Sequence, residues 1–212
     1  MRLLPPVLHK QAGLSFSKML GTGAGQGFSV KPDWSVYVVL GVWEDKVDYN
    51  NWLHSDAFQE LKSQSDGQVE IIMNPYLSKG TWNGKSPFIA NQKEQNSDLM
   101  GVITRASIKP SRLFSFWKEV PKVSKVISQQ SSLLFQKGMG EWPLIEQATF
   151  SIWDAEAAMR DFAYKQKEHA KVVKLTRKLD WYSEEQFTRF NIESIQGSWP
   201  NSLFNTILNR SF

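Results

Sequence analysis

Tyr37-Val-Val-Leu-Gly-Val-Trp43-Glu-Asp45 and Gln147-Ala-Thr-Phe-Ser-Ile-Trp153-Asp154 are two versions of one pattern, an apolar strand that ends at a tryptophan and an acidic residue. A stretch with helical spacing follows each version and reaches Phe58 in the first and His169 in the second. If one extra residue is allowed in the second version, Phe58 and His169 occupy the same position. The chain is therefore an internal duplication, and we expect that only the second copy kept a ligand or base at this position.

Other landmarks recur in the same order. Phe16-Ser-Lys-Met-Leu-Gly21 corresponds to Phe135-Gln-Lys-Gly-Met-Gly140, and Gly80-Thr-Trp82 corresponds to Gly197-Ser-Trp199. Several matches in one order argue against coincidence. The first copy lacks a counterpart of the opening strand, because the chain begins almost at the first helix.

The second copy predicts the order βαββαβ of a ferredoxin-like unit. We expect strands at 101–108, near 133–136, at 147–153 and near 186–195, with helices from Pro110 to about Ile127 and over 155–177. Pro121 predicts a kink or break in the first of these helices.

Two such units whose sheets face each other predict an α+β fold of the dimeric α/β-barrel type, with a cavity and without the first strand of repeat 1. The predicted parts are a first repeat at 1–82, a linker loop at 83–98, a second repeat at 99–199 and a C-terminal tail at 200–212.

The composition excludes several classes of chemistry. The 212 residues include no cysteine, so disulfides, thiolate metal sites and cysteine nucleophiles are excluded, and three histidines leave little for a multi-histidine site. The N-terminal residues resemble neither a signal peptide nor a transmembrane helix, which favours a cytoplasmic location. The nine Trp and thirteen Phe residues indicate either an aromatic core or a cavity for a large flat or polyene ligand.

The charge is unevenly divided along the chain. Residues 1–98 hold nine Lys and Arg against ten Asp and Glu, whereas residues 99–212 hold sixteen against eleven. A basic second half suits a solvated surface, anionic lipid, nucleic acid or the propionates of a heme. No aromatic strand motif for RNA accompanies the basic residues, so we predict no nucleic-acid partner.

Glycine and acidic residues give little support to other sites. Gly21-Thr-Gly-Ala-Gly-Gln-Gly27 matches neither nucleotide-binding glycine motif and precedes a strand rather than a helix, so we expect an inter-strand loop that could serve as a lid. No catalytic pair of carboxylates is indicated, because the carboxylates near strand ends suit helix N-termini: Asp33, Glu44, Asp45, Asp154 and Glu156.

His169 is the candidate metal ligand. It lies seven residues after Phe162 and four before Val173, so all three share one face of a helix, which we expect to point inward. One imidazole suffices to hold a heme iron, although a core histidine with satisfied hydrogen bonds has the same spacing. His9 and His54 have no comparable context.

Arg105 is the candidate contact for a carboxylate. It shares a strand face with Ile103 and Ser107, and if that face lines the barrel, the buried charge needs a partner. A carboxylate of a cofactor or a carboxylate of the protein would each serve as that partner. If the face is instead exposed to solvent, the charge needs no partner.

An ordered set of short motifs resembles the spheroidene monooxygenase family of carotenoid-modifying enzymes. The motifs extend from Phe16 to Trp199 and include Phe16-Ser-Lys-Met-Leu-Gly-Thr-Gly-Ala-Gly-Gln-Gly-Phe28, Pro32-Asp-Trp34, Val42-Trp-Glu-Asp45, Gly80-Thr-Trp-Asn-Gly84, Pro87-Phe88, Thr104-Arg-Ala106, Phe116-Trp117, Val120-Pro121, Gly138-Met-Gly-Glu141 and Thr149-Phe-Ser-Ile-Trp153.

The resemblance implies an oxidoreductase that contains heme b and uses O₂ to hydroxylate, and by repetition to ketolate, an acyclic carotenoid. It implies that His169 is the axial iron ligand, and it fits the cofactor role considered for Arg105. Electrons would come from a separate reductase, and an apolar substrate suggests peripheral contact with a membrane; a homo-oligomer is compatible with the fold. The alternatives are another heme enzyme on this scaffold, a dehydratase or a peroxidase-like enzyme, and a cofactor-free binding or oligomerisation protein.

Overall fold

The computed structural model describes residues 8, 11–25, 29, 31–90, 97–127, 129–142, 144–165 and 174–198, and for residues 121–126, 164 and 165 it describes the backbone alone. The first repeat contains β1 (Leu14–Gly23), β2 (Pro32–Trp43), α2 (Lys46–Leu53), α3 (Asp56–Ser63) and β3 (Gln68–Gly80). The second contains β4 (Met100–Ile108), the 3-10 helix η1 (Pro110–Arg112), α4 (Leu113–Ile127), β5 (Leu133–Gly140), β6 (Glu146–Trp153), α5 (Glu156–Lys165) and β7 (Tyr182–Ser198). Residues 174–179 form a further helical segment before β7.

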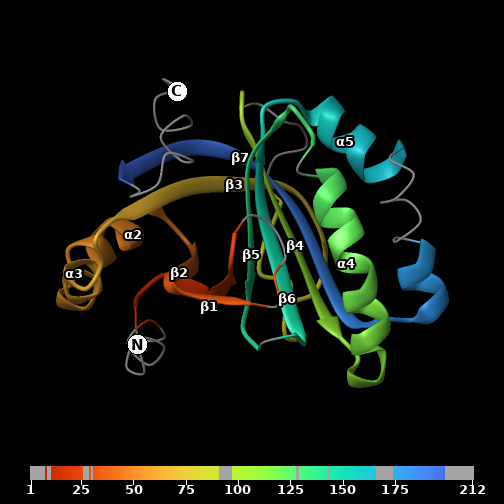
Figure 1. Cartoon of the computed structure of the whole chain (residues 1–212). Helices are drawn as coiled ribbons and strands as arrows, with labels where there is room; N and C mark the ends of the chain where they lie inside the picture. Colours follow the sequence, from red (N-terminus) through yellow and green to blue (C-terminus); the bar gives the residue numbers. More distant parts are fainter. Residues whose placement is uncertain are drawn as a thin grey trace.

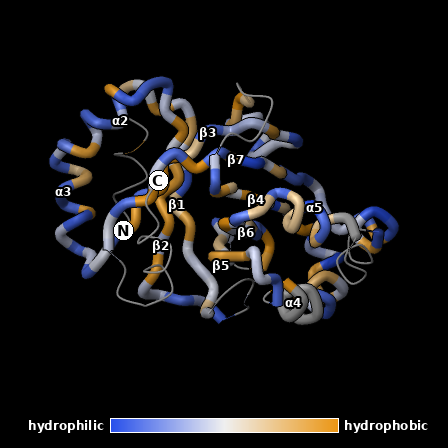
Figure 2. Tube along the Cα trace, turned by 90° about the horizontal axis from the view of Figure 1, so that it is seen from above, coloured by the Kyte–Doolittle hydropathy of each residue, from blue (hydrophilic) through white to orange (hydrophobic). Residues whose placement is uncertain are grey.

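One antiparallel sheet joins the two repeats. Its strand order is β2-β1-β5-β6-β4-β7-β3, and it curls so that β3 and β7 arch over the other strands (Figure 1). The helices of the two repeats lie on opposite outer sides, α2 and α3 on one and α4 and α5 on the other (Figure 2). The predicted α+β fold built from tandem ferredoxin-like repeats is confirmed.

The strand order also shows what the first repeat lacks. In the second repeat β4 lies between β6 and β7, as a split βαβ unit requires. The equivalents of β5, β6 and β7 in the first repeat are β1, β2 and β3. Within the described residues no strand takes the place equivalent to β4, and no pairing joins β2 to β3. The missing strand that the sequence predicts therefore corresponds to an open seam at the two edge strands.

Two glycines display the duplication in the backbone. Gly80 and Gly197, at the ends of β3 and β7, have φ values of 91° and 117°, where L-residues are strained. A Cβ on Gly80 would come 2.1 Å from the Glu185 carbonyl oxygen, and a Cβ on Gly197 would come 2.1 Å from that of Gln68. The two positions predicted to correspond therefore make the same close approach to the neighbouring strand.

The two faces of the sheet carry different clusters of buried side chains. On the concave inner face, Ile103 of β4 and Ala148 of β6 pack with Phe16 and Leu20 of β1. On the outer face of the second repeat, alternate residues of the same strands pack against the helices. Strand alternation thus assigns each residue of β4 to the barrel interior or to the helix layer.

Some predicted elements differ in length or continuity. The helix assignment continues through Pro121 to Ile127, so the predicted break does not occur. Phe116, Val120 and Ile127 are buried along α4, and this packing offsets the single hydrogen bond that proline removes. The strands near 133–136 and 186–195 are longer than predicted, and the helical stretch of the first repeat is divided at His54.

Acidic residues near strand ends have mixed roles. Asp45 caps α2 as predicted, since its side chain accepts a hydrogen bond from the Asp48 N–H. The prediction was wrong for Asp33, which accepts hydrogen bonds from Ser35 and pairs with Lys137 at 3.1 Å. The ion pair with Lys137 joins the start of β2 to β5.

The connection between the repeats also contributes to the core. Residues 83–90, part of the predicted linker loop, form no helix or strand beyond a tight turn at Asn83 and Gly84, and residues 91–96 lie outside the described residues. Phe88 nevertheless lies inside the barrel, 5% exposed, and its ring meets that of Phe190 at 5.1 Å.

Among the helices of the described part of the chain, none has the length and apolar character needed to cross a bilayer.

Candidate functional site

The predicted metal ligand follows α5, in a segment outside the described residues. The helix itself packs against the sheet through Met159 and Phe162, which are 3% and 7% exposed, and Phe162 meets Trp153 at 5.8 Å. The helix face that the sequence assigns to His169 is therefore the inward face at Phe162. Ligation by His169 itself stays a prediction.

Of the other histidines, His9 also lies outside the described residues. His54 is exposed at the end of α2, where its Nδ1 lies 2.7 Å from the Asn50 carbonyl oxygen. Among the described side chains, no group of three or more His, Asp and Glu residues is arranged to hold a metal ion.

Arg105 points into the barrel, on the same strand face as Ile103. It is 2% exposed, and its guanidinium pairs with the carboxylates of Glu146 and Glu184, from β6 and β7. The same guanidinium lies 5.6 Å from the ring of Trp82. Of the partners considered for this charge, the structure supplies protein carboxylates.

Glu184 connects this ion pair to the turn that follows β3. Its carboxylate accepts hydrogen bonds from the Thr81 hydroxyl at 2.7 Å and the Gly84 N–H at 2.7 Å. Burial alone would raise the pKa of Glu184, but the hydrogen bonds from Gly84, Thr81 and Arg105 lower that pKa to about 2. Glu184 is therefore ionised throughout the physiological range.

A second ion pair completes this cluster at the end of the barrel. Glu141 pairs with Lys18 at 2.5 Å and accepts a hydrogen bond from the Trp82 indole at 2.6 Å. With Arg105, Glu146 and Glu184, the cluster contains two cations and three carboxylates. A further anion such as a propionate would meet this net negative charge. If Arg105 binds a cofactor, one of its carboxylate partners would therefore have to move. The cofactor role of Arg105 stays a prediction.

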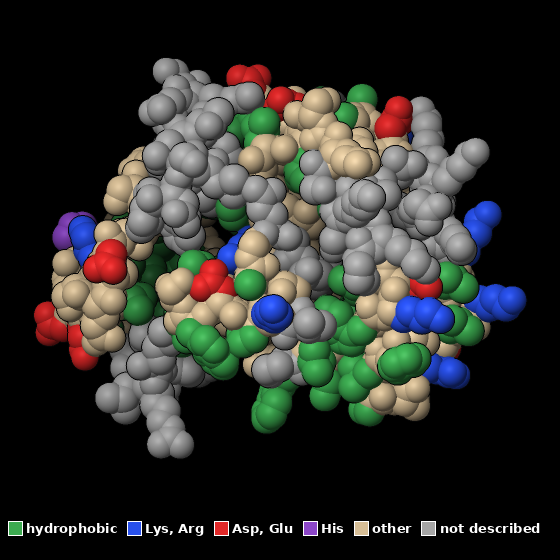
Figure 3. All heavy atoms as spheres, viewed as in Figure 1, with side chains coloured by type: hydrophobic (Ala, Val, Ile, Leu, Met, Phe, Trp, Pro, Cys, Tyr) green, Lys and Arg blue, Asp and Glu red, His purple; other side chains and the backbone are tan. Residues whose placement is uncertain are grey.

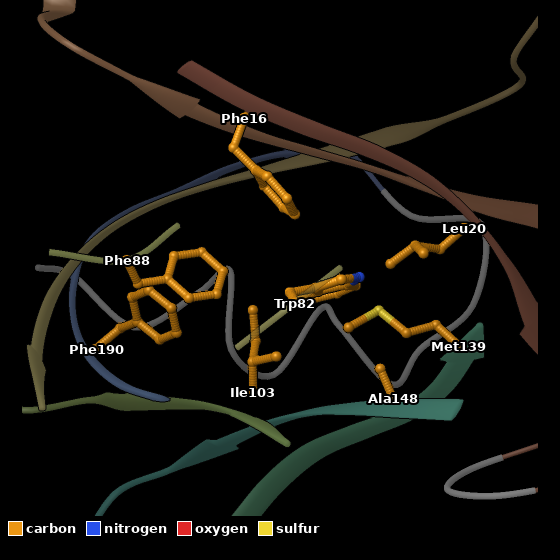
Figure 4. Packing of buried hydrophobic residues seen from close by; sticks show 8 residues of the cluster. All are labelled: Phe16, Leu20, Trp82, Phe88, Ile103, Met139, Ala148 and Phe190. Atoms are coloured by element: carbon orange, nitrogen blue, oxygen red, sulfur yellow. The ribbon is translucent and has the colours of Figure 1, made fainter. Parts of the chain in front are cut away.

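The middle of the barrel is filled by side chains (Figure 4). Phe16, Trp82 and Phe88 meet in edge-to-face contacts with ring centroids 5.7–6.5 Å apart. Leu20, Ile103, Met139 and Ala148 surround them with exposures of 0–4%. In the middle of the barrel the aromatic residues therefore form a packed core, one of the two possibilities that the composition indicates.

On the outer face of the second repeat, one residue in the middle of a central strand is exposed, although its neighbours on that face are buried. Thr104 lies in the middle of β4, paired with Thr149 of β6 and Phe187 of β7, yet it is exposed. Along the same face, Val102 is buried against α5 and Ile108 is buried against α4. The helix layer therefore covers both ends of this strand and leaves its centre accessible to solvent; we call this place the Thr104 opening.

A polar group is buried beside the Thr104 opening. Arg189 of β7, 5% exposed, pairs with Glu156 of α5 at 2.9 Å, and its guanidinium lies 5.5 Å from the Phe187 ring. Within the part of the chain that the structure describes, the Nε of Arg189 is buried without a hydrogen-bond partner. A buried donor that is not satisfied costs free energy, and an acceptor on a ligand would satisfy it.

Sequence reasoning did not identify Arg189 or Glu184 as candidates. Glu184, Gln186 and Thr188 alternate with Glu185, Phe187 and Arg189, a period-two pattern that marks two faces of one strand. The sequence could have pointed to these residues in two ways. The predicted strand near 186–195 had to begin at Tyr182, and polar residues on both faces of a central strand mark buried polar groups.

A scan against models of known protein families finds no match. Solved structures with a related chain trace include a protein provisionally named a monooxygenase from Fusobacterium nucleatum, at 13% identity and a TM-score of 0.45 over 89% of this chain and 82% of that chain. A protein of the same provisional name from Lactobacillus acidophilus has 10% identity and a TM-score of 0.43 over 92% and 86%.

Curated proteins give much higher sequence similarity. The spheroidene monooxygenase of Rhodobacter capsulatus is 32% identical over 195 residues, which are 91% of this chain and 81% of that protein. Those of Cereibacter sphaeroides and Rubrivivax gelatinosus are 32% and 29% identical over 91% and 89% of this chain, and over 60% and 73% of their own lengths. Identity at this level, over nearly all of the chain and most of the first relative, shows that the chain belongs to the spheroidene monooxygenase family.

Proposed function

We propose that this protein is a heme-dependent monooxygenase that hydroxylates, and by repetition ketolates, a long apolar substrate of the acyclic carotenoid class. The observation that carries the proposal is the 32% identity with the Rhodobacter capsulatus spheroidene monooxygenase over 91% of the chain. The ordered motifs from Phe16 to Trp199 resemble the same family.

The Thr104 opening is the place in the described structure that best fits a flat apolar group with an acidic edge. Apolar clusters border it at both ends, and the Phe187 side chain forms part of its floor. Arg189 supplies a buried N–H donor without a partner. His169 belongs to the segment that follows α5, the helix at one border of this opening, so we propose that His169 would hold the heme iron.

Each residue has a role that its chemistry supports. Phe187 would pack against the macrocycle and exclude water, and Arg189 would orient an acidic edge. A heme bound through one imidazole supplies the activation of O₂. The protein contributes binding, orientation and a dry environment for the substrate carbon.

The overall reaction also requires reductant. One oxygen atom of O₂ enters a C–H bond of the substrate and the other leaves as water, and this consumes two electrons and two protons. The sequence contains no nucleotide-binding glycine motif, so we propose a separate reductase as the electron donor.

Turnover tests this proposal. The purified protein, loaded with hemin and supplied with spheroidene in detergent and a reducing system, should give products that carry oxygen from ¹⁸O₂. Product formation without hemin would contradict heme dependence, and oxygen incorporated from water alone would contradict a monooxygenase. Turnover without added reductant would favour a different heme enzyme on this scaffold.

A further inference from the structure

Large apolar side chains are exposed together at one corner of the second repeat. Phe114 of α4 is 86% exposed, and Trp142 and Leu144 of the β5–β6 turn are 69% and 40% exposed. With the partly buried Trp117, these residues form what we call the α4 corner. Exposed aromatic side chains in such a group mark interaction surfaces more often than scattered ones do.

Hydrogen bonds hold the helix and the turn of the α4 corner side by side. The Trp117 indole donates to the Leu144 carbonyl at 3.1 Å, and the Ile108 N–H donates to the Ile145 carbonyl at 2.9 Å. In the space-filling view, hydrophobic side chains gather at the lower right over α4 and the neighbouring ends of β5 and β6 (Figure 3). The first bond joins α4 to the turn and the second joins the turn to the end of β4, so the apolar residues of the helix and the turn lie on one surface.

Basic side chains border the α4 corner. Arg112 and Lys118 are exposed on and next to α4. The helical segment 174–179 packs beside α4 through Leu175 and Leu179 and exposes its cations at 174, 177 and 178. Lys and Arg side chains line the right margin of the same face (Figure 3).

We propose that the α4 corner docks onto an anionic phospholipid bilayer, with Phe114 and Trp142 in the interfacial layer and the surrounding cations against the headgroups. Aromatic anchors next to Lys and Arg are typical of membrane-surface binding. The core of an interface between two protein copies is instead depleted of Lys, whereas Lys and Arg side chains border the α4 corner. The purpose of docking, the delivery of an apolar substrate to the neighbouring Thr104 opening, rests on the proposed function; the binding itself does not.

Co-sedimentation with vesicles tests the docking surface. We expect the full chain to bind vesicles with about 30% phosphatidylglycerol in phosphatidylcholine, and to bind pure phosphatidylcholine more weakly by about fivefold per engaged cation. The double variant Phe114→Ser/Trp142→Ser should bind vesicles at least about tenfold more weakly than the wild type. Transferring even one large apolar side chain out of water changes a partition equilibrium by about that factor.

The matched control is Trp34→Ser, which removes a tryptophan that is 75% exposed in the first repeat and should leave vesicle binding unchanged. The variant Arg112→Gln/Lys118→Gln should lose part of the preference for anionic vesicles. Circular dichroism must show that each variant is folded.

Vesicle binding that is equal in the wild type and the Phe114→Ser/Trp142→Ser variant would overturn the proposal. So would a wild-type dimer, seen by sedimentation velocity, that the same variant dissociates without any change in vesicle binding, because the α4 corner would then contact a second copy. Turnover of detergent-dispersed substrate should be the same in both proteins. If neither the wild type nor the Phe114→Ser/Trp142→Ser variant turned over the substrate, the proposed function would be wrong, and the vesicle-binding result would still stand.

Discussion

Glu184 is the residue on which the ion-pair cluster at the end of the barrel depends. It binds Arg105 from β4 and the turn after β3 at the same time, so one carboxylate connects three segments. The unsatisfied Nε of Arg105 and Oε1 of Gln186 lie in the same region. Losing the carboxylate would leave a buried guanidinium with a single partner.

The variant Glu184→Gln should lower the free energy of unfolding at pH 7 by about 3 kcal/mol, the value that corresponds to lowering a pKa from 4.5 to about 2. Because the folded-state pKa lies below the unfolded one, this stability is present above about pH 4.5 and is lost as the pH falls toward 2. Urea unfolding between pH 2 and 7 measures both effects. The exposed neighbour provides the control Glu185→Gln, and equal acid dependence in wild type and Glu184→Gln would contradict the assignment.

Thr104 is the residue that defines the opening on the outer face. The variant Thr104→Phe should fill the opening and weaken hemin binding by about tenfold or more, while the unfolding free energy changes by only about 0.5 kcal/mol, because the position is exposed. Hemin titration followed by absorbance measures the affinity. Thr104→Val keeps the shape and serves as the control, and unchanged affinity in Thr104→Phe would place the ligand elsewhere.

At the scale of elements, glycines at the ends of β3 and β7 permit the close approach of these two strands. The variant Gly80→Ala should destabilise the protein by about 3 kcal/mol or more, since it combines a positive φ with a Cβ 2.1 Å from a carbonyl oxygen. Gly84→Ala, at φ 72° with nothing within 4 Å, should cost only about 1 kcal/mol. Thermal or urea unfolding compares the two variants, and equal losses would show that close packing does not constrain Gly80.

Strand alternation placed Arg105 on the same face as Ile103 and Ser107, because side chains on a strand alternate whatever surrounds it, but it left open whether that face lines the barrel. Its partners were not predictable, since Glu146 and Glu184 lie 41 and 79 residues away in the sequence. Alternation places Thr104 on the same strand face as Val102, yet Thr104 is exposed and Val102 is buried. Its exposure depends on how the helix layer lies over the sheet, which no local pattern contains.

At the scale of the whole molecule, the duplication is asymmetric. The second repeat has all six elements of a ferredoxin-like unit, whereas the described part of the first has four positions filled and an open seam between β2 and β3. The aromatic core closes the barrel interior, and the Thr104 opening lies on the complete repeat.

An absorption spectrum tests most directly whether the second repeat holds a heme through His169, as we propose. Wild type and the exposed-histidine control His54→Ala, titrated with hemin and then treated with dithionite and CO, should show the same Soret band and the same shift on CO binding. His169→Ala should lose or displace that band. A protein that stays without a Soret band after hemin titration, or an identical band in His169→Ala, would contradict the claim.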